Sequence, residues 1–229
     1  AAKASLAKII ELKNYFVDKS VWIIGGDGWA YDIGYGGLDH VMASGQNVNV
    51  LVLDTEVYSN TGGQASKATP RGAIAKFAAS GKKMGKKNLG LMMMSYGSVY
   101  VASVNIGASR PQVLKAMLEA EAYNGPSIVI AYATCIAHGI RDMGKSVSEE
   151  KLASDAGHWP VYRYNPAVAE GTNPLTWESK EPTADFMGYI KGETRYKSLE
   201  AMFPAEAEKL FPLAKKDAEK RFETIKKML

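Results

Sequence analysis

The chain has 229 residues, of which 46% are hydrophobic and 23% charged, and its formal net charge is +4. This composition is typical of a globular protein and excludes the disordered and collagen-like classes. The excess lysines and arginines gather in residues 81–88 and 215–227, which read as solvated loop and helix faces, so no nucleic-acid partner is expected. The single cysteine, Cys135, excludes an intrachain disulfide framework and fits a reducing, cytoplasmic compartment. The sequence shows no signal-peptide pattern and no run of about 18 apolar residues, so no membrane span is expected.

Strand and helix patterns alternate along the first two thirds of the chain. The expected elements, in chain order, are a strand at 20–26, a helix at 35–45, a strand at 47–54, a helix at 71–80, a strand at 89–97, a helix at 109–123 and a strand at 125–134. This order predicts a doubly wound, mostly parallel α/β sheet with helices on both faces. In such sheets ligands bind beyond the carboxyl ends of the strands.

The alternation stops near residue 157. Residues 158–166 could form an edge strand, residues 170–183 read as a loop, and residues 205–229 read as a charged helix pair interrupted at Pro212. We therefore divide the chain into an α/β domain at 1–156 and a C-terminal extension at 157–229 that packs on this domain or on a partner.

A glycine-rich stretch, "IIGGDGWAYDIGYGG", follows the first strand and contains Asp27. A dinucleotide fingerprint would need G-x-G-x-x-G, and with Gly26 and Gly28 in the first two places the third falls on Tyr31. Tyrosine is too bulky for the close packing that this position requires. The spacing therefore argues against NAD binding, although Asp54 ends the second strand about where a ribose-binding acid would lie.

A second candidate is the segment "GIRDMGKS", Gly139 to Ser146, which satisfies the nucleotide-binding loop pattern G-x-x-x-x-G-K-[ST]. Six residues, 133–138, separate it from the core of the preceding strand, and the sequence after Lys145 is polar where a buried helix should follow. A surface turn before a polar helix is the competing interpretation.

The third candidate joins Asp27 to the end of the second strand. Both strand ends lie at the same edge of the predicted sheet, so Asp27, Thr55 and the Val57 carbonyl can face one crevice. Hard oxygen donors with the backbone amides of Gly26, Gly28 and Trp29 suit Mg²⁺ and a diphosphate. The simpler alternative is that Asp27 caps the next helix and that Asn60 is a left-handed turn residue.

The segments "GGDGWAYDIGYGGLDHV" and "LDTEVYSNTGGQASKATPRGAIAKFAASGKK" resemble the thiamin-diphosphate-binding domain of the pyruvate:ferredoxin (flavodoxin) oxidoreductase family. The general thiamin-diphosphate pattern has paired asparagines where this chain has Asp54 and Thr55, and that replacement is a feature of this family. The resemblance implies oxidative decarboxylation of pyruvate to acetyl-CoA and CO₂, with single electrons passing to iron–sulfur clusters. Pyruvate and coenzyme A would be substrates, and ferredoxin or flavodoxin the electron acceptor.

The resemblance also implies roles for individual residues. Asp27, Thr55 and the Val57 carbonyl would bind Mg²⁺, and Asn60 would face the reacting centre. Cys135 would ligate a [4Fe–4S] cluster, although a lone cysteine is otherwise more often a small buried residue. The residues that would line thiamin diphosphate are Gly26, Asp27, Gly28, Trp29, Thr55, Glu56, Val57, Tyr58, Ser59 and Asn60.

The chain lacks part of this machinery. A [4Fe–4S] cluster needs about four thiolates, so a cysteine-bearing segment elsewhere would have to complete it. The glutamate that activates the cofactor in this family lies on a separate pyrimidine-binding domain, and Glu56 is not its match. We therefore expect the chain to be the C-terminal half-site of a larger polypeptide or complex, a homodimer working in an anaerobic cytoplasm. A noncatalytic interaction subunit with the fold of an enzyme domain remains the alternative.

Overall fold

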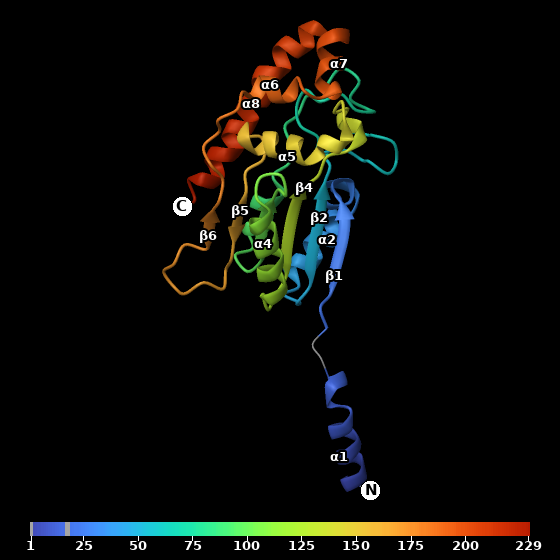
Figure 1. The fold of residues 1–229 in the computed structure, drawn as a ribbon, viewed down its shortest axis with the longest axis vertical. Coiled ribbons are helices and arrows are strands. Elements are labelled where there is room, and N and C mark those ends of the chain that lie inside the picture. The colour runs from blue at the N-terminus through green and yellow to red at the C-terminus, as the bar shows by residue number, and fades with distance from the viewer. Residues whose placement is uncertain (1, 17–18) are drawn as a thin grey trace.

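The computed structural model describes residues 2–16 and 19–229, and their strands form one six-stranded sheet of order β1-β2-β4-β3-β5-β6 (Figure 1). The first four strands in this order run parallel, and the last two pair antiparallel. This confirms the expected mostly parallel α/β sheet. The strands are β1 (Trp22–Gly26), β2 (Asn49–Asp54), β3 (Tyr100–Val104), β4 (Ser127–Tyr132), β5 (Tyr162–Tyr164) and β6 (Leu175–Trp177).

Helices cover both faces of the sheet. Val50 and Val52 of β2 belong to a large apolar cluster shared with α2, α3 and α8, whereas Leu51, between them, packs on the other side against the cluster of α4. This alternation follows from the period of two in a strand. The α-helices are α1 (Ala2–Glu11), α2 (Tyr35–Ala43), α3 (Leu89–Met94), α4 (Arg110–Ala122), α5 (Ser146–Asp155), α6 (Phe186–Ile190), α7 (Thr194–Met202) and α8 (Pro204–Lys226). A π-helical segment, η2 (Gly28–Ile33), and the 3₁₀ turns η1 (Lys13–Tyr15), η3 (Ile136–His138) and η4 (Met143–Lys145) complete the regular structure.

Two expected elements in the middle of the chain are wrong. Residues 71–80, expected as a helix, belong to an irregular loop that runs from Thr55 to Asn88. Residues 89–97, expected as a strand, contain helix α3, whose first turn is capped by the Asn88 side chain accepting from Leu91 N at 3.1 Å. A short apolar run does not by itself distinguish a strand from a buried helix, and the strand lies slightly later, at β3.

The C-terminal extension also differs from expectation. Residues 158–166, expected as an edge strand, contain β5, but this strand lies between β3 and β6 in the sheet. The edge position is taken by β6, which lies within residues 170–183, expected as a loop. Helix α8 runs unbroken through Pro212, so the predicted interruption is wrong. Its buried side chains, including Leu210 and Phe211, belong to the main apolar cluster, and this packing outweighs the lost backbone hydrogen bond.

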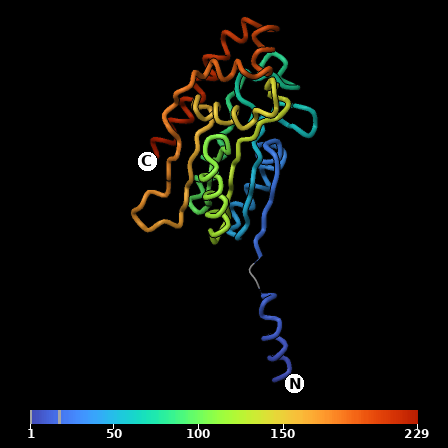
Figure 2. The backbone as a smooth tube through the Cα atoms, in the orientation of Figure 1, coloured from blue at the N-terminus to red at the C-terminus, as the bar shows by residue number. Residues whose placement is uncertain are grey.

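The extension lies over the carboxyl ends of the parallel strands. In Figure 1 the arrowheads of β1, β2 and β4 point toward α6, α7 and the irregular loop that follows β2. The tube in Figure 2 shows the same end of the molecule, with the red C-terminal segments beside the teal loop. Contacts support this placement, since Ile74 N of the loop donates to Arg195 O at 3.0 Å. The ligand-binding edge of the sheet is therefore bordered by the extension. No helix in the described part of the chain is long and apolar enough to cross a membrane.

Candidate cofactor site

The register of the sheet brings the expected site residues together. Gly26, the last residue of β1, lies opposite Leu53 of β2, and Asp54 lies opposite Tyr132 of β4. Residues that follow these three strands therefore emerge at one edge. Asp27 and Thr55 come directly after their strands, and Cys135 comes three residues after Tyr132.

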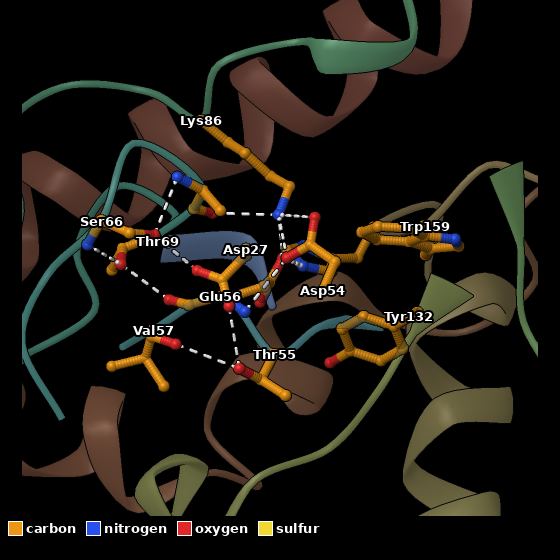
Figure 3. A network of polar contacts seen from close by, with 12 residues as sticks. Asp27, Asp54, Thr55, Glu56, Val57, Ser66, Thr69, Lys86, Tyr132 and Trp159 are labelled. Atoms are coloured by element: carbon orange, nitrogen blue, oxygen red, sulfur yellow. Dashed lines mark hydrogen bonds and ion pairs between the residues drawn. The ribbon is translucent and has the colours of Figure 1, made fainter. Parts of the chain in front are cut away.

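The three expected magnesium ligands converge around one hydroxyl (Figure 3). Thr55 Oγ1 lies 2.9 Å from Asp27 Oδ1 and 3.0 Å from the Val57 carbonyl oxygen. It also lies 2.8 Å from Ser59 Oγ. A hydroxyl carries one hydrogen, so it cannot donate to all of these oxygens at once. We call Asp27, Thr55 and Val57 the oxygen clamp.

Asp27 is a buried carboxylate, with 1% of its surface exposed. Burial and the nearby charge of Asp54 raise the pKa of Asp27 to about 6. Its Oδ2 accepts from Ser66 Oγ at 2.7 Å. Among the residues that the structure describes, no lysine or arginine forms an ion pair with it. The carboxylate is therefore placed where a bound cation would be favourable.

The simpler interpretation of this region does not agree with the structure. Asp27 occupies the N-cap position of η2, yet its side chain makes no capping hydrogen bond. The left-handed residue in the following turn is Glu56, with φ of 59°, and not Asn60. Asn60 is exposed within the turn at residues 59–62. Asp27 therefore faces the end of β2 instead of serving the helix that follows it.

The glycine stretch allows close approach of the neighbouring chain. A Cβ added at Gly28 would lie 2.3 Å from ring atoms of Tyr58, and one at Gly25 would lie 2.6 Å from the ring of Trp29. Gly26 is exposed at the end of β1. Tyr58 and Ser66 also line an open hollow of about 770 Å³ beside the clamp. The Tyr58 ring therefore occupies the space that a side chain at Gly28 would need.

Cys135 lies next to the oxygen clamp. Its half-buried sulfur accepts from Ser59 Oγ at 3.2 Å, and that same Ser59 oxygen lies 2.8 Å from Thr55 Oγ1. Cys135 also occupies the N-cap of η3, where Ala137 N donates to the sulfur at 3.4 Å. One serine therefore connects the candidate cluster ligand to the candidate magnesium ligand.

The Glu56 side chain points away from this crevice into the protein. Its carboxylate is fully buried and accepts from Arg195 Nη2 at 2.8 Å and pairs with His158 Nε2 at 2.9 Å. Although burial opposes ionisation, His158, Lys86 and Arg195 hold the pKa of the Glu56 carboxyl well below its usual range. Only the backbone of Glu56 could line a cofactor.

Several residues at this site were not identified from the sequence. Ser66 donates to Asp27, Lys86 pairs with Asp54 at 2.7 Å, and His138 Nε2 lies 2.7 Å from the Thr55 carbonyl oxygen. These residues come from the irregular loop and from η3, and no spacing pattern marks them. His40 is exposed, whereas His138 and His158 are buried in this polar network.

The two other nucleotide-binding patterns fit the structure poorly. Tyr31, where a dinucleotide fingerprint needs glycine, is buried and donates to Asp54 Oδ2 at 2.6 Å, so Asp54 is not free for a ribose. In the segment from Gly139 to Ser146, the Asp142 carboxylate accepts from Gly144 N at 2.9 Å. An acidic side chain thus takes an amide that a phosphate would need, and the nucleotide-binding loop is not favoured.

The donor set of the clamp fits magnesium. One carboxylate, one hydroxyl and one carbonyl are hard oxygen donors, and Mg²⁺ commonly completes its octahedron with water and substrate phosphates. Within the described ranges, no group of three or more His, Cys, Asp and Glu side chains is placed to hold a metal. The clamp is therefore suited to a cation that a diphosphate also binds, and not to a closed protein cage.

Comparisons with known proteins agree with this geometry. Residues 2–131 match the family described as thiamine pyrophosphate enzyme, C-terminal TPP binding domain. The chain is 62% identical over 227 residues to the pyruvate:ferredoxin oxidoreductase of Moorella thermoacetica, covering 99% of this chain and 19% of that protein. It is 56% identical over 218 residues to the pyruvate-flavodoxin oxidoreductase of Enterobacter agglomerans, covering 94% of this chain and 18% of that protein. The chain thus spans about a fifth of the length of the curated relatives it matches.

A solved structure supports the fold. The 2-oxoglutarate:ferredoxin oxidoreductase from Magnetococcus marinus, with 2-oxoglutarate, coenzyme A and succinyl-CoA bound, matches with a TM-score of 0.50 and 21% sequence identity. The match covers 77% of this chain and 62% of that chain. At this identity the likeness concerns the architecture of the sheet and its helices.

Proposed function

Since the chain belongs to the thiamine pyrophosphate enzymes, as their C-terminal TPP-binding domain, we propose that it is the diphosphate-binding part of a pyruvate:ferredoxin or pyruvate-flavodoxin oxidoreductase. The reaction would be the oxidative decarboxylation of pyruvate to acetyl-CoA and CO₂. The similarity to relatives of that name over nearly the whole chain supports this choice of substrate.

The observation that carries the proposal is the oxygen clamp. Asp27 Oδ1 and the Val57 carbonyl both lie within 3.0 Å of Thr55 Oγ1, and the buried Asp27 carboxylate forms no ion pair with a described lysine or arginine. Mg²⁺ bound here would neutralise a diphosphate and fix its position. The assignment of the magnesium to these three residues is part of the proposal.

The remaining residues would take the following roles. The backbone from Gly26 to Trp29 and the turn from Thr55 to Asn60 would enclose the diphosphate end of the cofactor, with Asn60 nearest the reacting centre. Thiamin diphosphate would supply the nucleophilic carbon and the electron sink for decarboxylation. Cys135 would provide one ligand of a [4Fe–4S] cluster close to the cofactor, which suits single-electron transfer.

The proposal requires partners beyond this chain. A pyrimidine-binding domain would supply the activating glutamate, and a segment rich in cysteine would supply the other cluster ligands. Ferredoxin or flavodoxin would accept the electrons, coenzyme A would accept the acetyl group, and the complete enzyme would work as a homodimer in a reducing, anaerobic cytoplasm.

The test is the variant Asp27→Asn in the full-length protein, with Asp39→Asn as the control. Asp39 is a partly exposed carboxylate on α2 that accepts from Tyr96. Asp27→Asn should abolish magnesium-dependent retention of thiamin diphosphate and pyruvate-dependent reduction of ferredoxin, and Asp39→Asn should leave both unchanged. Unchanged retention and activity in Asp27→Asn would instead support a noncatalytic interaction subunit.

A further inference from the structure

We propose that Arg195, in the C-terminal extension, is a positioning residue for the oxygen clamp. It holds the backbone of Thr55 and Glu56 so that the Thr55 hydroxyl and the Val57 carbonyl face the same point. The inference rests on the proposed function, because it concerns the same three oxygen donors. It assigns to the extension a part in cofactor binding that packing alone does not explain.

The clamp depends on an unusual turn at Glu56. This residue has φ of 59°, and Phe77 is the one other non-glycine residue with positive φ in the described ranges. A side chain disfavours this conformation, so the surrounding structure has to hold it. The turn folds the chain back after β2 and brings the Val57 carbonyl oxygen 3.0 Å from Thr55 Oγ1.

The backbone of Glu56 is fixed at both of its polar groups. Its N–H donates to Asp54 Oδ1 at 3.0 Å, and its carbonyl oxygen accepts from Thr69 Oγ1 at 2.6 Å (Figure 3). These two hydrogen bonds fix the backbone of the turn. The Glu56 side chain anchors the turn as well, because its carboxylate is fully buried and bound by other side chains.

Arg195 belongs to a group of buried polar side chains beside this turn, together with Glu56, Glu193 and His138. Its Nη2 donates to Glu56 Oε2 at 2.8 Å, and its Nε donates to Glu193 Oε2 at 2.6 Å. Glu193 Oε1 lies 3.6 Å from His138 Nδ1, and His138 Nε2 contacts the Thr55 carbonyl oxygen at 2.7 Å. The Thr55–Glu56 unit is thus held at its carbonyl group by His138 and at its carboxylate by Arg195, and Glu193 orients Arg195 by accepting from its Nε.

Arginine is required for this geometry. The planar guanidinium presents nitrogens in a fixed arrangement and here contacts two carboxylates at once, whereas lysine has one nitrogen on a flexible stem. Glu56, Glu193, Arg195 and His138 are all buried, so water cannot easily replace a lost contact. Glu193 and Arg195 lie at the start of α7, which places the extension directly behind the metal-ligand turn.

The experiment compares Arg195→Lys with Arg163→Lys in the full-length protein. Arg163 is a matched control, because it is also a buried arginine that contacts two carboxylates, those of Glu119 and Glu178, and it lies on β5. The measurement is the Mg²⁺ concentration that gives half-maximal binding of thiamin diphosphate in equilibrium dialysis. It is made at a temperature at which both variants keep the circular dichroism spectrum of the parent protein.

Arg195→Lys should raise this Mg²⁺ concentration about tenfold or more, an effect of the size seen when groups that orient metal ligands are removed. Arg163→Lys should change it less than about twofold, even if both variants lower Tm. If both variants lower Tm but Arg195→Lys leaves the Mg²⁺ concentration for half-maximal cofactor binding unchanged, the inference is overturned.

A second pair keeps the inference testable if Arg195→Lys does not fold. Glu193→Gln retains an oxygen that can accept from Arg195 Nε and should bind Mg²⁺ nearly as the parent does, whereas Glu193→Leu removes the acceptor that orients Arg195 and should bind it more weakly. Equal Mg²⁺ dependence in the two variants would contradict the inference. If Asp27→Asn loses Mg²⁺ binding while these variants keep it, the inference alone fails; if Asp27→Asn also keeps it, the proposed function fails.

Discussion

The hydroxyl of Thr55 lies 2.9 Å from Oδ1 of Asp27, a residue 28 positions earlier in the chain. The two meet because β1 and β2 are adjacent and parallel, with Gly26 opposite Leu53. The Val57 carbonyl lies close to the same hydroxyl because Glu56 adopts a left-handed conformation. The clamp thus needs both a sheet register and one strained turn.

The first prediction concerns the Thr55 hydroxyl. Thr55→Val removes an oxygen donor with little change of volume, and it should weaken Mg²⁺-dependent binding of thiamin diphosphate at least about tenfold, or about 1.4 kcal/mol. Thr55→Ser keeps the oxygen and should bind within a few-fold of the parent. Calorimetric titration of the cofactor into the full-length protein with Mg²⁺ present measures the difference. Equal binding by the two variants would show that the hydroxyl is not a ligand.

The second prediction uses two glycines on the same stretch of chain. Gly28→Ala places a Cβ 2.3 Å from the Tyr58 ring, so the ring, which follows Val57 of the clamp in the chain, has to move. We expect cofactor affinity to fall about tenfold or more. Gly36→Ala is the control, because nothing lies within 4 Å of its Cβ on α2. It should leave affinity unchanged and stabilise the helix by up to about 1 kcal/mol.

The oxygen clamp could be predicted from the sequence because its members follow strands. Asp27, Thr55 and Val57 lie just beyond β1 and β2, and parallel strands bring their carboxyl ends to one edge. The contacts of Ser66 and Arg195 could not be predicted in this way. They depend on the path of the irregular loop after β2 and on the position of α7. No spacing of residues in the sequence predicts either of these.

The errors in secondary structure have a similar origin. The run "LGLMMM" is apolar throughout, so its pattern does not distinguish helix α3 from a strand, and the Asn88 cap decides the outcome. Residues 71–80 have a helical pattern, yet Lys82 N donates to Ala73 O and Ile74 N donates to Arg195 O. Tertiary hydrogen bonds thus replace the local ones there.

The third prediction concerns Cys135. Cys135→Ser in the full-length protein should remove about one cluster's iron, because an alkoxide oxygen is a poor replacement for a thiolate in an iron–sulfur site. Mg²⁺-dependent cofactor binding should remain, since Cys135 reaches the clamp only through Ser59. Iron analysis and visible absorbance measure the loss. An unchanged iron content would remove Cys135 from the cluster.

The fourth prediction is a pH dependence of the metal-free protein. Burial, reinforced by the charge of Arg195, lowers the pKa of His138 from 6.5 to about 3. Between these pH values the unfolded chain binds a proton on this histidine that the folded protein excludes. The free energy of unfolding therefore has its full contribution from His138 above pH 6.5 and falls as the pH drops toward 3. Protonation of His138 in the unfolded chain should lower the free energy of unfolding by about 1 kcal/mol between pH 6.5 and about pH 5.5.

Comparison with His138→Gln isolates this contribution, because glutamine does not titrate and the other groups are present in both proteins. Glu193, whose pKa burial raises to about 7, has the opposite sign: the folded form retains its proton longer than the unfolded chain. It titrates in both proteins, so its effect cancels to first order. The opening free energy of the segment from β2 to Val57, measured by hydrogen exchange and corrected for intrinsic rates, should therefore fall with acid more steeply in the parent than in His138→Gln. Parallel pH profiles would show that His138 is protonated normally in the folded protein.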